Sequence, residues 1–269
     1  MRIARAEYGS LRAYGILLDD DSFVPVAATL EELVSNLSDA IEENDVAMAR
    51  QRAADDPVPA ESYRLLAPCE PSKIVAVGLN YRDHARELGQ ALPDEPIIFL
   101  KPPTSVIGPG DTIVLPPESS RVDYEAELAF VVGKRARRVS EADAPGHILG
   151  YTCANDVTAR DLQQKDGQWT RAKSFDTFCP LGPWIETSFT CEGKRISSAV
   201  NDVLRQDSTL DNLIFKPHEL LSFISSVMTL EPGDVVLTGT PAGIGKLFSN
   251  DRISVTIDGI GVLANIVSE

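Results

Sequence analysis

The stretch GPGDTIVL at residues 108–115 joins a Pro-Gly-Asp turn to a run of β-branched side chains. The same unit returns as EPGDVVL at residues 231–237, and a variant of it, SNDRISV, occupies residues 249–255. Turn residues that lead into β-branched runs predict strands. Long alternating strand–helix units, which a doubly wound parallel sheet needs, are missing from the sequence. The chain therefore predicts an α+β, β-rich fold with a mixed sheet.

The sequence before these units predicts a small N-terminal domain. Residues 1–27 alternate apolar and polar side chains around polar turns, which indicates a short meander of strands. Residues 29–54 have the apolar spacing of a helix, carried by Leu30, Leu33, Leu37 and Ile41. The run DDPVP at residues 55–59 then breaks the pattern. We expect a small α+β domain over residues 1–68 and the main domain over residues 69–269.

Three elements are expected at the start of the main domain. Residues 73–78 (KIVAVG) have the pattern of a buried strand, and residues 96–101 (PIIFLK) are expected to form another strand. Between them, residues 80–88 are compatible with a short helix, which Gly89 can end.

Composition and charge restrict the class of protein. The chain has 269 residues, 43% of them hydrophobic, and a formal net charge of −15. A strongly acidic surface repels phosphate backbones, so nucleic acid is not an expected partner. No apolar run is long enough for a membrane span, and residues 1–8 lack the pattern of a signal peptide, which together predict a cytoplasmic protein. The four cysteines show no Cys-x-x-Cys spacing and are interpreted as reduced thiols.

Two acidic side chains precede an apolar stretch in YEAELAFVV, residues 124–132. Side chains two positions apart on a strand share a face, so Glu125 and Glu127 are expected to point the same way. Adjacent buried carboxylates repel each other, and a divalent cation relieves that cost. Oxygen ligands suit Mg²⁺ or Mn²⁺. The alternative is an exposed strand face that carries two solvated acids.

Asp156 follows a strand of small and apolar residues, YTCAN at residues 151–155, and precedes a stretch compatible with a helix. It is a candidate third metal ligand. The alternative for Asp156 is a helix N-cap, which an aspartate fills equally well.

His84 and Glu87 are three residues apart in a segment compatible with a helix, so their side chains are expected to be neighbours. A carboxylate beside a histidine orients the ring and raises its basicity, which makes the pair a candidate general base. The alternative is an ordinary surface pair. No comparable histidine–carboxylate pair is recognised for His147 or His218, and both are interpreted as structural.

Lys173 lies among aromatic and small residues in WTRAKSFDTF, residues 169–178. It is a candidate buried cation that holds a carboxylate or polarises a carbonyl, and a snorkelling surface lysine is the alternative. Residues 237–246 (LTGTPAGIGK) form a glycine-rich turn, but Leu247 stands where a nucleotide P-loop needs Ser or Thr. This turn could offer backbone N–H groups and the Thr240 hydroxyl to a carboxylate. Neither a Gly-x-Ser-x-Gly nor a Gly-x-Gly-x-x-Gly motif is present, which argues against a serine hydrolase and a nicotinamide enzyme.

Together, and in this order, these motifs resemble the fumarylacetoacetate hydrolase family from about residue 70 onward. The matching elements are Gly78-Leu79-Asn80-Tyr81 followed by His84-Ala85 and Glu87; Phe99-Leu100-Lys101-Pro102; Asp123-Tyr124-Glu125-Ala126-Glu127-Leu128; Asn155-Asp156-Val157-Thr158-Ala159-Arg160-Asp161; Ala172-Lys173-Ser174-Phe175-Asp176; and residues 230–245.

The resemblance implies a rolled mixed β-sheet fold of the fumarylacetoacetate hydrolase type, with a small N-terminal domain, and a homodimer. It implies that Glu125, Glu127 and Asp156 bind Mg²⁺ or Mn²⁺, and that the segment with His84 and Glu87 is a lid over the substrate. That lid signature and the glutamine seven residues beyond Asp156 are most similar to the acylpyruvase and oxaloacetate decarboxylase branch. No nucleic-acid or membrane partner is implied.

For this branch we expect carbon–carbon bond cleavage in a small 2-oxo acid or 2-oxo dicarboxylic acid. Cleavage leaves an enolate, whose charge a bound dication stabilises, and Lys173 adds positive charge to the same oxygens. Oxaloacetate loses carbon dioxide without water attack, whereas an acylpyruvate needs His84 and Glu87 to activate water. The candidates for holding the substrate's carboxylates and carbonyls are Lys101, Arg160, Gln163 and Thr240.

Two other functions stay open from the sequence. Similar enzymes isomerise or decarboxylate unsaturated diacids such as 2-hydroxyhepta-2,4-diene-1,7-dioate through the same type of enolate. A protein of another class, which keeps the fold and binds a metal without catalysis, is the second alternative, because a fold does not fix a function.

Overall fold

Strands dominate the computed structural model, which describes residues 1–53 and 55–269. Its central sheet is mixed, and β4 (Arg64–Leu65) and β7 (Val106–Ile107) pair alongside β1 and β13. The main path of this sheet runs β3 (Phe23–Ala27), β2 (Leu11–Leu17), β1 (Arg2–Tyr8), β13 (Cys179–Glu186), β11 (Ile148–Asn155), β10 (Ala126–Val132), β16 (Val235–Leu237), β5 (Ile74–Gly78) and β6 (Ile97–Lys101).

Two further sheets complete the β-structure. A five-stranded sheet runs β15 (Val203–Thr209), β14 (Arg195–Val200), β18 (Arg252–Ile257), β19 (Gly261–Ser268) and β8 (Thr112–Val114). A small sheet runs β12 (Thr158–Ala159), β9 (Val122–Tyr124) and β17 (Gly245–Lys246). Buried side chains such as Leu128 and Cys153 of the central sheet pack against Ile196, Val255 and Leu263 of the five-stranded sheet. The predicted α+β, β-rich fold with mixed sheets is confirmed.

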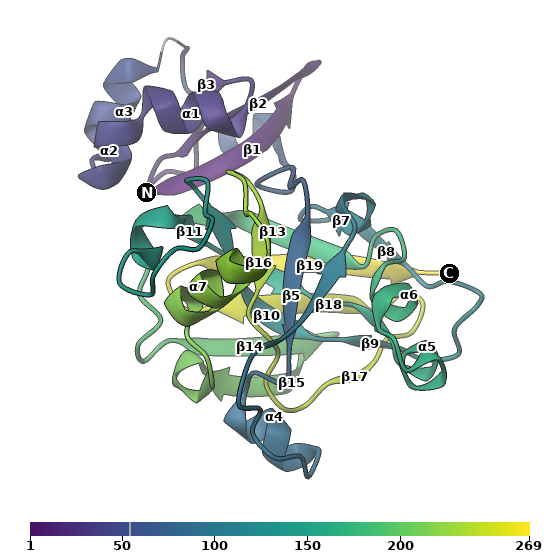
Figure 1. Ribbon diagram of the computed structural model, residues 1–269. Coiled ribbons are helices and arrows are strands. Elements are labelled where there is room, and N and C mark those ends of the chain that lie inside the picture. The colour runs from purple at the N-terminus through teal and green to yellow at the C-terminus, as the bar shows by residue number, and fades with distance from the viewer. Residues whose placement is uncertain (54) are drawn as a thin grey trace.

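Seven α-helices are arranged around these sheets in the described residues. One of them, α7 (Pro217–Val227), packs on the central sheet through Leu220, Leu221 and Ile224. In Figure 1 the N-terminal helices lie at one end of the molecule and α4 lies at the opposite end. The other six helices are α1 (Leu30–Asn36), α2 (Ser38–Glu42), α3 (Val46–Arg52), α4 (Arg82–Glu87), α5 (Arg160–Asp166) and α6 (Thr170–Lys173).

The helix expected over residues 29–54 is three short helices, and residue 54 lies outside the described residues. The expected helix is interrupted because new helices begin within the segment. Thr29 begins α1 with a capping box to Glu32, and the Asp45 side chain accepts the Met48 N–H at the start of α3. Between them Asn44 has a φ of 53°, which is incompatible with a continuous right-handed helix.

The N-terminal meander of strands is confirmed, and it continues the central sheet. β1 pairs antiparallel with β13, with Arg2 opposite Glu186 and Ile3 opposite Ile185. Met1, Ile3 and Ile16 share a buried cluster with residues of the main domain. A domain boundary near residue 68 therefore remains a prediction, which limited proteolysis can check.

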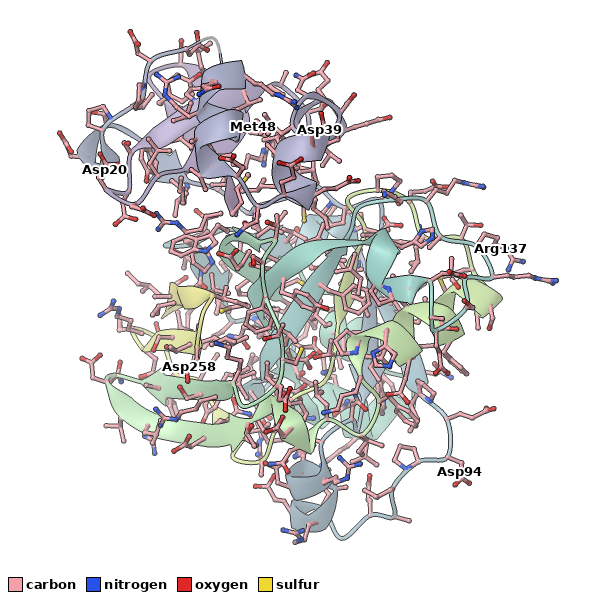
Figure 2. The ribbon with its side chains drawn as sticks, turned by 90° about the vertical axis from the view of Figure 1, so that its left-hand side faces the viewer. Asp20, Asp39, Met48, Asp94, Arg137 and Asp258 are labelled. Atoms are coloured by element: carbon pink, nitrogen blue, oxygen red, sulfur yellow. The ribbon has the colours of Figure 1, made fainter. Side chains whose placement is uncertain are left out.

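The exposed side chains of Asp20 and Asp258 lie at the edge of the molecule in Figure 2. In the part of the chain that the structure describes, no helix is both long and apolar enough to cross a membrane.

The recurrent turn–strand units share one hydrogen-bond pattern. In each, the aspartate side chain accepts the backbone N–H three residues earlier: Asp111 from Gly108 at 2.8 Å, Asp234 from Glu231 at 2.7 Å, and Asp251 from Phe248 at 2.8 Å. The residue before each aspartate has a positive φ, which glycine or asparagine adopts at low cost: Gly110, Gly233 and Asn250. The Pro-Gly-Asp signal therefore predicted the strands β8 and β16 for a physical reason.

Replacing Asp234 by alanine is expected to lower the free energy of unfolding by about 2–3 kcal/mol. The Asp234 side chain is fully buried and also accepts from the Ser72 hydroxyl, the Lys73 N–H and the Lys73 ammonium group, all of which lose their partner. Urea unfolding measures the effect. Asp251→Ala, at the same position of a half-buried turn, is the control and should cost less. Equal losses in the two variants would contradict this account.

Candidate active site

A break between two strands creates the acidic centre of the site. The sequence predicted one strand over residues 124–132, but β9 ends at Tyr124 and β10 begins at Ala126. The reason is that β9 pairs in the small sheet, whereas β10 pairs with β11 and β16 in the central sheet. Glu125 lies at the break, where its N–H donates to Asn155 Oδ1 at 2.9 Å and its carbonyl accepts the Asp156 N–H at 2.9 Å.

Three carboxylates converge at this break. One oxygen from each of Glu125, Glu127 and Asp156 lies within 4.8 Å of the others. Their exposed fractions are 6%, 1% and 1%, which rules out the alternative of solvated acids on a strand face. Asp156 follows β11 directly, and the residue that caps α5 is Ala159, so Asp156 is not a helix N-cap.

Cations surround the three acids. Lys173, which is 2% exposed, donates to Glu125 at 2.9 Å and to Asp156 at 2.5 Å, so the snorkelling alternative does not hold. Lys101 donates to Asp156 at 2.6 Å, and the Arg160 guanidinium donates to Glu125. Burial of a carboxylate is costly without such compensation, so the protein alone neutralises much of the negative charge here.

The two glutamates are held in different electrostatic environments. Burial disfavours the charged form of Glu125, but Lys173 and Arg160 outweigh that effect and lower the pKa of Glu125 to about 2. Burial, Asp156 and Glu125 raise the pKa of Glu127 well above its usual value. The pKa of Lys173 is raised, because Asp156 and Glu125 outweigh the effect of its burial. Glu127 is therefore the acid whose negative charge the protein's own cations compensate least.

A cavity of about 260 Å³ opens onto the acidic centre. It lies between the end of β5, the α4 segment, helices α5 and α6, and the glycine-rich turn after β16. One wall is aromatic, where Phe99 and Trp169 pack edge to face at 5.2 Å. The cavity is lined by Val77, Gly78, Leu79, His84, Leu88, Gln90, Phe99, Glu125, Glu127, Asp156, Arg160, Gln163, Gln164, Trp169, Lys173 and Thr240.

His84 and Glu87 form a hydrogen-bonded pair at the cavity. His84 Nδ1 lies 3.0 Å from Glu87 Oε2, and the histidine is only 7% exposed, so an ordinary surface pair does not describe it. The Glu87 carboxylate also accepts the Gly243 N–H at 3.2 Å, which connects α4 to the glycine-rich turn. A carboxylate on Nδ1 leaves Nε2 as the ring nitrogen free to exchange a proton.

The candidates for holding a substrate are placed differently from one another. Arg160, Gln163 and Thr240 line the cavity, and Arg160 donates to Gln163 at 2.6 Å. The Thr240 hydroxyl donates to the Ala126 carbonyl at 2.9 Å, so its proton is already engaged. Lys101 is not among the lining residues. Its ammonium group lies beside Asp156 and also donates to the Lys173 carbonyl at 2.6 Å, which makes it a support for the acidic centre.

Two features of the site were not singled out in the sequence. Asp123 is fully buried and bridges Arg121 and Arg160, which holds Arg160 against Glu125. Gly78 gives room to Trp169, because a Cβ atom there would lie 2.5 Å from the indole ring. Asp123 belongs to one of the motifs quoted for the family. Its partner Arg121 is two residues away, whereas Arg160, which it holds in the site, is 37 residues away along the chain.

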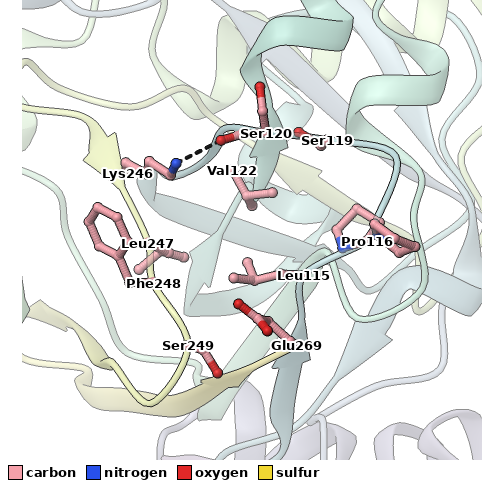
Figure 3. A pocket seen from close by; sticks show the side chains of 11 residues that line it. Leu115, Pro116, Ser119, Ser120, Val122, Lys246, Leu247, Phe248, Ser249 and Glu269 are labelled. Carbon is pink, nitrogen blue, oxygen red and sulfur yellow. Dashed lines mark hydrogen bonds between the residues drawn. The ribbon is translucent and has the colours of Figure 1, made fainter.

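A larger cavity, of about 470 Å³, lies away from this centre (Figure 3). Leu115, Val122, Leu247 and Phe248 give it an apolar lining, and the ammonium group of Lys246 donates to the Ser120 carbonyl at 2.7 Å. Among the described residues that line it there is no cluster of acids and bases, so its size alone suggests no chemistry.

Comparisons with known proteins agree with this site. The family model described as fumarylacetoacetate (FAA) hydrolase C-terminal matches residues 73–268. A mitochondrial oxaloacetate tautomerase of Bos taurus is 40% identical over 267 residues, which cover 94% of this chain and 84% of the relative.

Solved structures agree over the whole length of the chain. A 5-carboxymethyl-2-hydroxymuconate delta-isomerase from Mycobacterium smegmatis has a TM-score of 0.86 and 40% identity, covering 100% of this chain and 98% of its own. A maleylpyruvate hydrolase from Sphingobium sp. SYK-6, in complex with manganese(II) and pyruvate, has a TM-score of 0.80 and 30% identity, covering 100% of both chains.

The protein therefore belongs to the fumarylacetoacetate hydrolase family, a family of enzymes that act on small organic acids. The resemblance predicted from the sequence motifs is confirmed, as is the fold that it implied.

Proposed function

We propose that the protein is a divalent-metal-dependent enzyme that interconverts the enol and keto forms of a small 2-oxo dicarboxylic acid, of which oxaloacetate is the smallest example. The observation that carries this proposal is the composition of one cavity of about 260 Å³. It joins three buried carboxylates, two cations and a histidine–carboxylate pair. A volume of this size suits a small acid better than a long-chain substrate.

The acidic centre fits a divalent metal. Glu125, Glu127 and Asp156 supply only oxygen donors, which is the ligand set that Mg²⁺ and Mn²⁺ favour. Glu127 lacks a basic partner close enough for an ion pair within the described residues, so a cation would relieve the remaining repulsion. When bound, the metal would act as a Lewis acid that stabilises negative charge on the substrate's keto oxygen.

The protein's own side chains account for the proton transfer. In the keto-to-enol direction, His84 Nε2 takes a proton from the carbon next to the keto group and passes it to the keto oxygen, and the reverse direction returns the proton to that carbon. Glu87 holds the imidazole ring through Nδ1. Lys173 places a fixed positive charge beside the carboxylates where negative charge develops on the substrate. Arg160 and Gln163 are the side chains that we assign to the substrate's distal carboxylate, because both line the cavity.

The histidine–carboxylate pair favours this reaction over simple decarboxylation. Loss of carbon dioxide from oxaloacetate needs an electron sink but no general base, whereas enol–keto exchange needs a base for the carbon-bound proton. The names of the Bos taurus tautomerase and the Mycobacterium smegmatis isomerase agree, since both describe proton transfer without loss of a carbon fragment.

Carbon–carbon bond cleavage, which the sequence predicted first, stays as a second candidate function. The specific observation in its favour is the likeness to a maleylpyruvate hydrolase whose structure holds manganese(II) and pyruvate. Hydrolysis of an acylpyruvate would use His84 to activate water, and oxaloacetate decarboxylation would release carbon dioxide. Both reactions share the enolate with the proposed isomerisation, so the products distinguish them.

The test is the rate at which the ultraviolet absorbance of enol-oxaloacetate decays, with Mg²⁺, Mn²⁺ or EDTA, corrected for free metal. We expect a metal-dependent acceleration with no matching release of carbon dioxide. Matching release would favour the cleavage reaction, and turnover of acetylpyruvate alone would favour the hydrolase. Metal binding without turnover of any 2-oxo acid would show a metal-binding protein without catalysis.

His84→Gln is expected to lower kcat by about 10²-fold, because a positioned general base typically contributes 10²–10⁴-fold. The value of KM should change little, because the metal and the cations that hold the substrate remain. Steady-state kinetics on enol-oxaloacetate measure both constants. His147→Gln, which changes a histidine remote from the cavity, is the control. An unchanged kcat in His84→Gln would remove the histidine from the mechanism.

The homodimer and the cytoplasmic location implied at the sequence level remain predictions. Sedimentation velocity of the purified chain tests the first, and fractionation of the source cells tests the second.

A further inference from the structure

Gln206 is a fully buried side chain that the sequence motifs did not include and that does not line the cavity. It lies on β15, in the five-stranded sheet, and its side chain reaches Ala126 at the start of β10. Its side-chain amide uses all four of its ordinary hydrogen-bond positions. Oε1 accepts from the Ala126 N–H at 3.0 Å and from the Ser198 hydroxyl at 2.9 Å, and Nε2 donates to Thr240 Oγ1 at 2.8 Å and to the Pro241 carbonyl at 2.9 Å.

Gln206 and its hydrogen-bond partners fix the position of Ala126, the residue between the two glutamates. Ala126 separates Glu125 from Glu127 at the point where the strand breaks. Its N–H is bound by Gln206, and its carbonyl accepts the Thr240 hydroxyl at 2.9 Å. Because Gln206 also donates to Thr240, the two side chains together fix both backbone polar groups of Ala126.

The same amide also holds the glycine-rich turn. Its bond to the Pro241 carbonyl fixes residues that follow Gly239, and the Gly239 N–H donates to Glu127 Oε2 at 2.6 Å. Gly243 packs so closely on β15 that a Cβ atom would lie 2.6 Å from the Arg205 carbonyl oxygen. Gln206 therefore supports Glu127 by two routes, through the strand and through the turn.

We propose that Gln206 is the positioning residue of the metal site, and that its amide sets the backbone geometry which brings the Glu125 and Glu127 carboxylates together. This inference rests on the proposed metal site. Only an amide meets the requirement, because two donors and two acceptors are needed in one buried side chain. A break in a strand does not by itself direct two carboxylates to one centre. The hydrogen bonds to Ala126 therefore take the place of the backbone hydrogen bonds that a regular strand pair would provide.

The experiment is a titration of the metal-free protein with Mn²⁺, followed by the electron paramagnetic resonance signal of the free ion, which needs no turnover. The variant is Gln206→Met, which keeps the length of the side chain and removes its hydrogen bonds. We expect the Kd for Mn²⁺ to rise about 10-fold or more, as for other groups that orient metal ligands. The control is Ser198→Ala, which removes one bond to the same amide but leaves its bonds to Ala126 and Thr240.

Unfolding midpoints separate positioning from general stability. Gln206 positions the ligands if Gln206→Met weakens Mn²⁺ binding by far more than Ser198→Ala does at comparable loss of stability. Thr240→Val provides a second route, which also serves if Gln206→Met does not fold. It should weaken Mn²⁺ binding in the same direction, and the double variant should lose less than the product of the two single effects.

Each contrary outcome points to one error. If the unmodified protein binds no Mn²⁺, the metal site of the proposed function is wrong. If it binds Mn²⁺ and either Gln206→Met or Thr240→Val binds equally well, the positioning role is overturned and the metal site stands. Equal weakening in Gln206→Met and Ser198→Ala would likewise overturn it, because it would show a purely structural contribution.

Discussion

Glu127→Gln is expected to abolish Mn²⁺ binding and to lower turnover of enol-oxaloacetate by at least about 10⁴-fold. The metal is the main source of charge stabilisation in the proposed mechanism, a contribution of several kcal/mol, and each 1.36 kcal/mol is a factor of about ten in rate. Glutamine keeps the size of the side chain and the oxygen that accepts the Gly239 N–H. It removes only the negative charge that a cation needs.

The same substitution is expected to leave the metal-free protein as stable as before, or more stable. Burial, Asp156 and Glu125 raise the pKa of Glu127 well above its usual value, so its charged form is costly in the absence of metal. Thermal unfolding with EDTA and with Mn²⁺ measures both states. Glu118→Gln removes the same charge from an exposed position and should change neither. Undiminished Mn²⁺ affinity in Glu127→Gln would contradict the assignment of this ligand.

Lys173→Met is expected to lower turnover by about 10³-fold and the free energy of unfolding of the metal-free protein by about 3–5 kcal/mol. The first effect follows from the loss of a fixed positive charge where negative charge develops, and the second from leaving buried carboxylates without a partner. Lys173 donates to both Glu125 and Asp156, so one substitution affects two acids. Added Mg²⁺ should recover part of the lost stability, because a dication takes over the compensation.

Lys246→Met is the matched control for Lys173→Met. Both ammonium groups lie over a phenylalanine ring, Lys173 over Phe99 at 5.0 Å and Lys246 over Phe248 at 5.1 Å. Lys246 is exposed, however, and its ammonium group donates to the Ser120 carbonyl and to none of the three acids. Its replacement should change stability by no more than about 0.5 kcal/mol. Comparable effects of the two substitutions on turnover would show that the position of Lys173 is unimportant.

Local patterns predicted the strands and most of the acidic centre. The Pro-Gly-Asp units predicted β8 and β16 because their hydrogen bonds lie within four consecutive residues. Glu125 and Glu127 were recognisable because two acids precede an apolar run, and the order of motifs along the chain identified the family. The first two signals are local patterns, and the third is the order of motifs along the chain. Both kinds can be recognised without knowing which segments contact each other in the folded protein.

The remaining features depend on contacts between distant segments. The break at Glu125 arises because β9 and β10 belong to different sheets. The residues near the break did not predict it. Lys101 was expected to hold substrate, but its ammonium group lies beside Asp156, which is 55 residues away along the chain. Gln206 meets Ala126 across 80 residues and carried no local signal. Long-range partners of this kind decide what a polar side chain does.

The most direct test of the central claim is the exchange of the carbon-3 protons of oxaloacetate for solvent deuterium, followed by proton nuclear magnetic resonance. The purified protein would be assayed with Mg²⁺, with EDTA and as Glu127→Gln. The account predicts exchange well above the rate of free Mg²⁺, lost both on adding EDTA and in the variant. Exchange no faster than with free Mg²⁺ would contradict enol–keto proton transfer as the reaction of this site.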